Sequence, residues 1–302
     1  AMGRSVKFNL EHKGTQWVVL LFLAFIWGSS FILMKKGLQS FNYFQVAAFR
    51  VFISFMVILP LSLKNLKKIN KGNIKSLLIV GFVGTAIPAA LYTKAQTTID
   101  SSLAGVLNSL TPLFTMVIGI IFYGTRVKKV QAAGIFIGLA GTFGLIHGFH
   151  PLDLSSMNYY ALFIVLATAC YGINVNEIKE NLAGMTGIEI ASLGFFFIGP
   201  FAGIYLLLSD MPPLLNHPGN LINLGYVALL AIFGSVLALV IFNTLIQYTT
   251  SLFAASVTYI IPVFALFWGY FDGEFIGIFD ILMMLVIFLG VYLVNHKKKV
   301  RQ

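Results

Sequence analysis

The feature that most constrains this chain is a series of long apolar stretches, each about as long as a helix that crosses a bilayer. A spanning helix needs roughly 20 apolar residues, and the chain carries ten such stretches among its 302 residues. Only 10% of the residues are charged, whereas soluble proteins carry about 25%. The stretches are continuous, unlike the alternating segments of about ten residues that build a membrane β-barrel. We therefore expect an all-α integral membrane protein. Its ten spans are expected at residues 16–36, 43–63, 74–94, 102–123, 130–149, 157–178, 187–208, 221–246, 252–271 and 275–295.

The distribution of Lys and Arg predicts how these spans are oriented. With the N-terminus inside, the inner segments hold sixteen of the twenty basic residues and the outer segments hold three. Basic loops stay in the cytoplasm, so we expect a multi-pass protein of the plasma membrane, specifically a bacterial inner membrane, with both termini cytoplasmic. The net charge of +10 is assigned to this bias, and no nucleic-acid partner is expected.

An internal repeat relates the two halves of the chain. NSLTPLFTMVIG (108–119) aligns with TYIIPVFALFWG (258–269), and GFVGT (81–85) aligns with AIFGS (231–235) at the same offset. The first spans of the two halves also align, so that Ser30 falls opposite Asn174 and Lys35 opposite Lys179. Because each half holds an odd number of spans, the second half would enter the membrane from the opposite side, as in many secondary transporters. We expect two inverted five-helix repeats, with the first at 1–149 and the second at 150–302.

Several motifs resemble those of a known family. The Trp-Gly of the first span, the Arg early in the second and the Pro of the fourth and ninth resemble the EamA branch of the drug/metabolite transporter superfamily. So does a Gly-Glu pair before the tenth span. These residues are Trp27, Gly28, Arg50, Pro112, Pro262, Gly273 and Glu274. The first half departs from the pattern, with Gly124-Thr125 where the family often has Gly-Glu. The resemblance implies transport of small metabolites, often by export, through a central cavity lined by spans one, three, four, six, eight and nine.

Polar side chains inside apolar spans supply the candidate binding residues, because such groups are costly in lipid and should face a cavity or another helix. Asn108, Thr111 and Thr115 share one helix face around Pro112, which predicts either a bent helix facing a cavity or a kinked packing helix. The amide groups of other spans could equally serve as interhelical contacts. The candidate substrate-binding residues are Trp27, Ser30, Tyr92, Gln96, Asn108, Thr111, Tyr171, Asn174, Asn243, Gln247, Thr258 and Tyr259.

Two charged residues within the spans have open interpretations. Arg50 lies seven residues into the second span, where it could act in gating or bind a substrate anion. Alternatively, it could extend to the lipid headgroups or to a helix carbonyl. Glu177 lies near the inner end of the sixth span and could pair with Lys179 or with water.

Together these features predict a secondary transporter that moves a small organic metabolite by alternating access, with export slightly favoured. An amino acid, a nucleobase or a similar amphipathic solute would suit a cavity rich in aromatic and amide groups. The chain has no nucleotide-binding loop, so the energy would come from gradients, with a proton or a sodium ion as the candidate coupling ion. We expect no enzymatic activity, cofactor or metal site, and a monomer or homodimer in the lipid bilayer. The alternatives are a lipid or lipid-linked flippase and, less favoured, an integral membrane enzyme.

Overall fold

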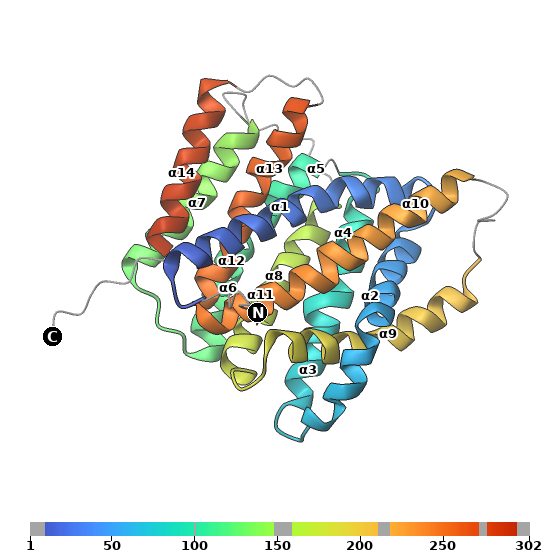
Figure 1. The fold of residues 1–302 in the computed structure, drawn as a ribbon. Helices are drawn as coiled ribbons and strands as arrows, with labels where there is room; N and C mark the ends of the chain where they lie inside the picture. The colour runs from blue at the N-terminus through green and yellow to red at the C-terminus, as the bar shows by residue number, and fades with distance from the viewer. Residues whose placement is uncertain (1–9, 100, 148–158, 211–217, 272–276, 295–302) are drawn as a thin grey trace, which may run out of the picture.

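The computed structural model describes residues 10–99, 101–147, 159–210, 218–271 and 277–294 of the chain, and these residues are almost entirely helical (Figure 1). The boundary expected between the two halves, at residues 149 and 150, lies outside the described residues. So do Gly273 and Glu274. The helices in chain order are α1 (Lys13–Leu38), α2 (Tyr43–Asn65), η1 (Leu66–Lys68), α3 (Ile74–Gly81), η2 (Phe82–Ala86), α4 (Ile87–Ala95), α5 (Ser101–Asn108), α6 (Thr111–Tyr123), α7 (Lys129–His147), α8 (Ala161–Asn181), α9 (Gly187–Leu208), α10 (Pro218–Leu229), η4 (Leu230–Leu237), α11 (Ala238–Tyr248), α12 (Ser251–Ala255), α13 (Val257–Phe271) and α14 (Ile278–Val294).

The helices identify the chain as an all-α membrane protein, as expected from the sequence. Within the described residues, six helical stretches are long and apolar enough to cross a membrane, and shorter apolar helices accompany them. Large apolar side chains also point outward from the bundle, including Leu207, which is 86% exposed, and Phe122, which is 75% exposed. A water-facing surface would not tolerate so many apolar side chains, but lipid would solvate them. The relation of the two halves as inverted repeats stays a prediction.

Two of the expected spans are interrupted rather than continuous. The span expected at 102–123 is divided between α5 and α6, with Ser109 and Leu110 between them. Pro112 occupies the first turn of α6, where its missing N–H costs nothing. The hydroxyl of Thr111 donates to the carbonyl oxygen of Asn108 at 2.7 Å, which satisfies the last turn of α5. The span expected at 252–271 is likewise divided between α12 and α13 at Ser256. The bent helix expected around Pro112 is therefore two helices, α5 and α6.

Two further spans contain a π-helical segment, in which the helix widens to hold extra residues per turn. The segment η2 joins α3 to α4, and η4 joins α10 to α11. These segments contain most of the two aligned motifs, GFVGT and AIFGS. Segments of this kind are frequent at functional sites. Residues of η2 line the cavity described below, and η4 contacts side chains that line it.

Helices from different parts of the chain pack in pairs. The helix α7 lies along α14, and α2 lies along α9 (Figure 1). Glycines permit the close approach of α7 to α14, because a Cβ on Gly290 would lie only 2.6 Å from Cα of Gly138. Similarly, α1 packs against α13, and α8 packs against α6. Residues from the middle of α1 and α8 therefore lie near the centre of the bundle. Residues of α4, α11 and α13 lie there as well.

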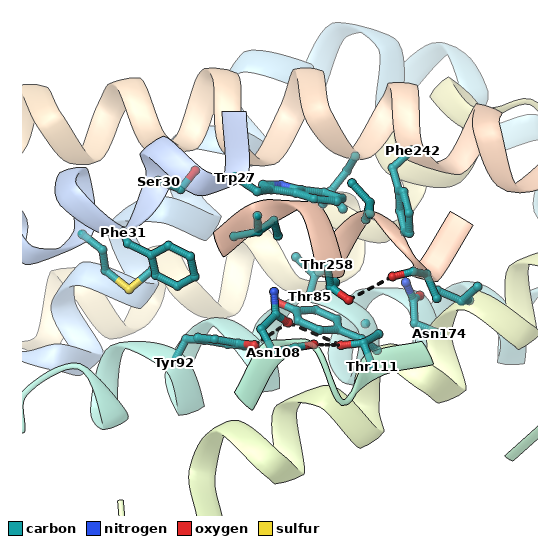
Figure 2. A pocket seen from close by; sticks show the side chains of 18 of the residues that line it. Trp27, Ser30, Phe31, Thr85, Tyr92, Asn108, Thr111, Asn174, Phe242 and Thr258 are labelled. Carbon is teal, nitrogen blue, oxygen red and sulfur yellow. Dashed lines mark hydrogen bonds between the residues drawn. The ribbon is translucent and has the colours of Figure 1, made fainter. Parts of the chain in front are cut away.

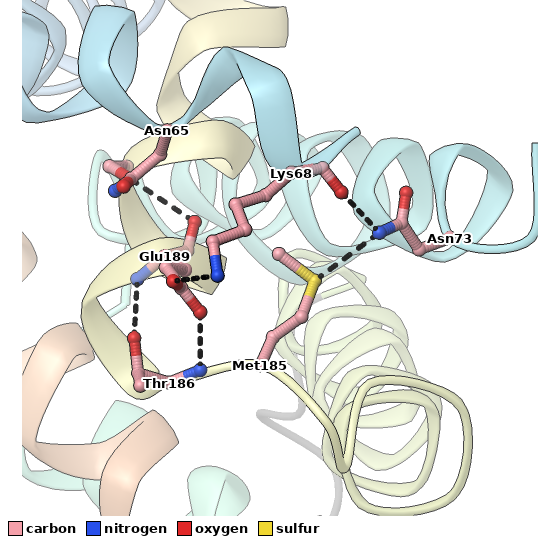
Figure 3. Close-up of polar contacts among 7 residues, drawn as sticks. Asn65, Lys68, Asn73, Met185, Thr186 and Glu189 are labelled. Carbon is pink, nitrogen blue, oxygen red and sulfur yellow. Dashed lines mark hydrogen bonds and ion pairs between the residues drawn. The ribbon is translucent and has the colours of Figure 1, made fainter. Parts of the chain in front are cut away.

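Polar contacts join the C-terminal end of α2 and the following η1 to the start of α9 (Figure 3). Thr186 and Glu189 form a reciprocal capping box that sets the first turn of α9. The carboxylate of Glu189 also lies 3.5 Å from Nζ of Lys68, and Nδ2 of Asn65 donates to the hydroxyl of Ser192 at 3.0 Å. These contacts join the paired helices α2 and α9 at one end of the pair.

Candidate functional site

A cavity lies at the centre of the bundle and is lined by residues of α1, α2, η2, α4, α5, α6, α8, α11, α12 and α13 (Figure 2). Its empty space, counted together with the open mouth, is about 870 Å³. The residues that line it are Trp27, Ser30, Phe31, Met34, Arg50, Gly84, Thr85, Tyr92, Asn108, Thr111, Tyr171, Asn174, Val175, Leu239, Phe242, Ala255, Val257, Thr258 and Ile261.

Most of the residues singled out from the sequence meet in this cavity. They come from both halves of the chain and from helices that lie far apart in sequence. The predicted residues that line the cavity are Trp27, Ser30, Arg50, Tyr92, Asn108, Thr111, Tyr171, Asn174 and Thr258. Asn108 and Thr111 both line the cavity, and their part in binding a solute stays a prediction.

One wall of the cavity is a hydrogen-bonded polar group around the break between α5 and α6. The hydroxyl of Tyr92 donates to Oδ1 of Asn108 at 2.6 Å, and the hydroxyl of Thr111 lies 3.3 Å from the same oxygen. Figure 2 shows these three side chains together on one side of the pocket. The ring of Tyr92 also stacks on that of Tyr171, with 6.0 Å between centroids. The wall is thus ordered by its own contacts, while its aromatic faces and amide border the cavity.

The opposite wall is aromatic and is attached to the π-helical segment η4. The indole N–H of Trp27 donates to the carbonyl oxygen of Gly234 at 2.9 Å, and its ring meets Phe242 edge-on, with 5.1 Å between centroids. Trp27 lies across the pocket from Asn108 in Figure 2. The structure thus places Trp27 on the cavity wall with its N–H already bonded.

Two glycines in the π-helical segments make room for polar side chains from the opposite half. A Cβ on Gly84 of η2 would collide with the amide of Asn174 on α8. At the aligned position in η4, a Cβ on Gly234 would lie 2.8 Å from Oγ of Ser30 on α1. Asn174 is only 4% exposed, and its Oδ1 accepts no hydrogen bond from any described residue. This oxygen is therefore a buried acceptor at the edge of the cavity.

Arg50 turns into the protein rather than toward the headgroups. Its Nε donates to the hydroxyl of Ser235 in η4 at 2.7 Å, and the side chain lines the cavity. The alternative in which Arg50 extends to the lipid headgroups or to a helix carbonyl is not the conformation observed. The structure thus brings a cation to the cavity from α2, the second helix of the chain.

Four predicted residues do not line this cavity, which corrects their expected place on its wall. Tyr259 is fully buried, and its hydroxyl donates to the carbonyl oxygen of Ile135 on α7 at 2.8 Å. Gln247 donates to the carbonyl oxygen of Leu182, just beyond the end of α8, at 3.1 Å. Gln96 caps the end of α4, beyond the cavity wall. Asn243 is buried in α11, where its neighbour Phe242 lines the cavity instead.

The lining residues that sequence reasoning missed are mainly apolar. They are Phe31, Met34, Val175, Leu239, Phe242, Ala255, Val257 and Ile261, together with Gly84. Only Phe31 and Met34 carried a usable signal, because they follow Trp27 at the spacing of one helix face. Thr85 was one of several polar positions in its span, and it also lines the cavity.

Side-chain hydrogen bonds join the C-terminal end of α8 to its neighbours. Glu177 accepts from the hydroxyl of Tyr123 at the end of α6 and from Nδ2 of Asn181. Its expected pairing with Lys179 is not observed, because Nζ of Lys179 donates to the carbonyl oxygens of Ile246 and Gln247, each at 3.0 Å. A cation at the last carbonyls of a helix is favourable, so Lys179 fastens α8 to the end of α11.

A multi-pass helical membrane protein with a polar and aromatic cavity at its centre is the class that this fold and site define. The sequence model of the EamA-like transporter family matches residues 15–147 and, separately, residues 158–296. The chain belongs to the EamA-like transporter family, as the motifs of the sequence indicated. It is accordingly a membrane transporter rather than an enzyme by family.

The chain is also similar to curated proteins and to a solved structure. The inner membrane transporter YedA of Escherichia coli (strain K12) is 27% identical over 92% of this chain and 90% of its own length. A probable terminal-alkyne amino-acid exporter of Streptantibioticus cattleyicolor is 20% identical over 66% of this chain and 65% of its own length. A solved crystal structure superposes on this chain with a TM-score of 0.71 at 14% sequence identity. The match covers 94% of this chain and 97% of the chain in that structure. This last likeness concerns the fold alone.

Proposed function

We propose that this protein is a secondary transporter that moves a small organic solute across the membrane by alternating access. The observation that carries the proposal is the cavity itself, in which aromatic and amide side chains from both halves of the chain converge. Solute sites of secondary transporters lie near the bilayer midplane, where interrupted helices of two repeats meet. The cavity here lies beside the α5–α6 and α12–α13 breaks and both π-helical segments.

The pairing of helices supports two inverted halves, residues 1–149 and 150–302. The second helices of the halves pack together as α2 and α9, and the fifth helices pack together as α7 and α14. The first helix of each half packs on the fourth span of the other, as α1 on α13 and α8 on α6. Two halves that exchange equivalent contacts can also exchange conformations, which provides a route to alternating access.

An asymmetry between aligned lysines supports a gating motion. Lys179 holds α8 to the end of α11, at the side that the charge bias assigns to the cytoplasm. Lys35, its counterpart on α1, is exposed and makes no hydrogen bond or ion pair with any described residue. The inner ends are thus fastened while the aligned outer contact is open. In the opposite state we expect Lys35 to bond the end of α4 and Lys179 to be released.

The setting of the proposed transporter follows from the sequence. Both termini would lie in the cytoplasm, in a bacterial inner membrane, as the sixteen-to-three charge bias indicates. Export is slightly favoured, and the exporter of Streptantibioticus cattleyicolor offers a precedent among the relatives. A proton or sodium ion is the candidate for coupling, and the working unit is a monomer or a homodimer.

Solute counterflow in proteoliposomes tests this proposal. We expect saturable exchange of at least one compound from a panel of amino acids, N-acyl amino acids and nucleobases. Asn108→Ala should lower the flux at least about tenfold, because it removes the acceptor that orders the polar wall. Gly225→Ala is the matched control, since a Cβ there meets nothing within 4 Å, and its flux should equal that of the parent protein. Absence of saturable flux for the whole panel would contradict the proposal.

A further inference from the structure

The charges around the cavity are unbalanced. Arg50 is its single cation, and none of the described residues that line the cavity is Asp or Glu. The side chain forms no ion pair with any described carboxylate. A guanidinium held inside a membrane protein without a counter-ion is costly, because it loses its hydration. A negatively charged group on a ligand would offset this desolvation cost.

The geometry of Arg50 leaves its outer donors available. Its Nε is occupied by the hydroxyl of Ser235 at 2.7 Å, and this bond anchors the side chain to η4. The terminal Nη1 and Nη2 groups make no hydrogen bond with a described residue. Paired N–H groups of a guanidinium match the two oxygens of a carboxylate. The anchored Arg50 side chain can therefore bind one carboxylate through its two terminal nitrogens.

A second unfilled group lies on another wall of the same cavity. Oδ1 of Asn174 is buried and accepts no hydrogen bond from any described residue, although buried acceptors are nearly always paired. Around the cavity, Trp27, Phe242 and Tyr171 provide aromatic surface. A ligand that satisfies these groups has a carboxylate, an apolar or aromatic body and an N–H donor.

We propose that the cavity binds a small organic monocarboxylate whose anionic group pairs with Arg50 and whose N–H group donates to Oδ1 of Asn174 once the amide turns from Gly84 toward the cavity. The proposal rests on the proposed transport function and names its substrate class. A monoanion neutralises the cavity, whereas a zwitterion would leave the same net charge and would bring an ammonium group for which the described lining provides no carboxylate. A free cation would be repelled by Arg50.

Binding to the full chain in lipid nanodiscs tests this assignment with five probes that share one phenyl ring. N-Acetylphenylalanine is the monoanion with an N–H group, and N-acetylphenylalaninamide is its neutral analogue. 3-Phenylpropanoate is a monoanion without the N–H group. Phenylalanine is the zwitterion, and 2-phenylethylamine is the cation. We expect the N-acetyl acid to bind about ten- to hundredfold more tightly than its amide, the gain of a charge-assisted hydrogen bond. It should also bind more tightly than the other three probes.

Variants assign the preference to the two groups. Arg50→Gln should abolish the preference for the acid over the amide, and Arg50→Lys should retain part of it. Asn174→Ala should abolish the difference between the N-acetyl acid and 3-phenylpropanoate. Lys36→Gln, which removes an exposed positive charge outside the cavity, should change neither. Thermal unfolding of each variant confirms that it is folded.

Other results would overturn the assignment. These are equal binding of the acid and the amide, tighter binding of the zwitterion or the cation, no binding of the acid up to its solubility limit, or a preference for the acid that survives in Arg50→Gln. Saturable transport of a neutral or zwitterionic solute, independent of Arg50, would reject the substrate class but leave the transporter intact. Absence of saturable transport for every compound would reject the proposed function instead.

Discussion

At the scale of single residues, the cavity depends on where side chains are absent as much as on where they are present. Gly84 and Gly234 lie in the two π-helical segments, and each leaves the space that a polar residue of the opposite half occupies. Asn174 fills the first space and Ser30 the second. Packing against the backbone of Gly84 and Gly234 therefore helps to fix the positions of Asn174 and Ser30.

Gly84→Ala tests this dependence. The new methyl group would collide with the amide of Asn174, so we expect a loss of about 1–3 kcal/mol in the free energy of unfolding, typical of overpacking. Solute binding in the cavity should weaken as well. The measurement is chemical or thermal unfolding of the purified protein, with Gly225→Ala as the control. Gly225 lies exposed in α10 with open space around it, so its substitution should be neutral or stabilising by up to about 1 kcal/mol. Equal stability of the two variants would contradict the argument.

At the scale of helices, local interruptions decide which side chains reach the cavity. A regular helix would carry the periodicity of a span from one end to the other. A π-helical turn holds extra residues and therefore shifts that phase. In α11, which follows η4, Phe242 lines the cavity, whereas the candidates Asn243 and Gln247 do not.

The pair α7 and α14 provides a test at this scale, because it lies outside the set of helices that line the cavity. Gly290→Leu would place side-chain atoms within 2.6 Å of the backbone of Gly138. We expect the two helices to separate, with a loss of at least about 2 kcal/mol in stability, while the affinity of the remaining folded protein for its solute changes less than about threefold. Thermal unfolding and equilibrium binding on the same preparation measure both. A large loss of affinity without a loss of stability would show that this pair acts on the cavity.

At the scale of the whole molecule, the expected orientation in the membrane remains the most consequential prediction. Lys71 lies in an exposed segment between α2 and α3, and Tyr159 lies exposed just before α8. The charge bias predicts that these two positions lie on opposite sides of the bilayer, with Lys71 in the cytoplasm. The single cysteine, Cys170, is within α8 and is easily removed by substitution.

Single cysteines placed at these positions test the orientation. In a Cys170→Ala background, we expect a membrane-impermeant thiol reagent added to intact cells to label Tyr159→Cys and to spare Lys71→Cys. Labelling of both should occur after the membrane is permeabilised. If both positions are labelled equally in intact cells, the opposed threading of the two halves is wrong. The mechanism of alternating access proposed here would then lose its structural basis.

The amino-acid sequence by itself determined the class of this protein, because the cost of unpaired backbone in lipid leaves an apolar run of twenty residues little choice but to form a helix. It also determined the family and most of the polar residues of the cavity, which lipid would otherwise penalise. Only the tertiary structure decided that Tyr259 turns to α7, that Arg50 bonds Ser235 and that Phe242 replaces Asn243. Each of these depends on which helices pack together and in which rotational phase, and such contacts between distant segments leave no trace in local periodicity.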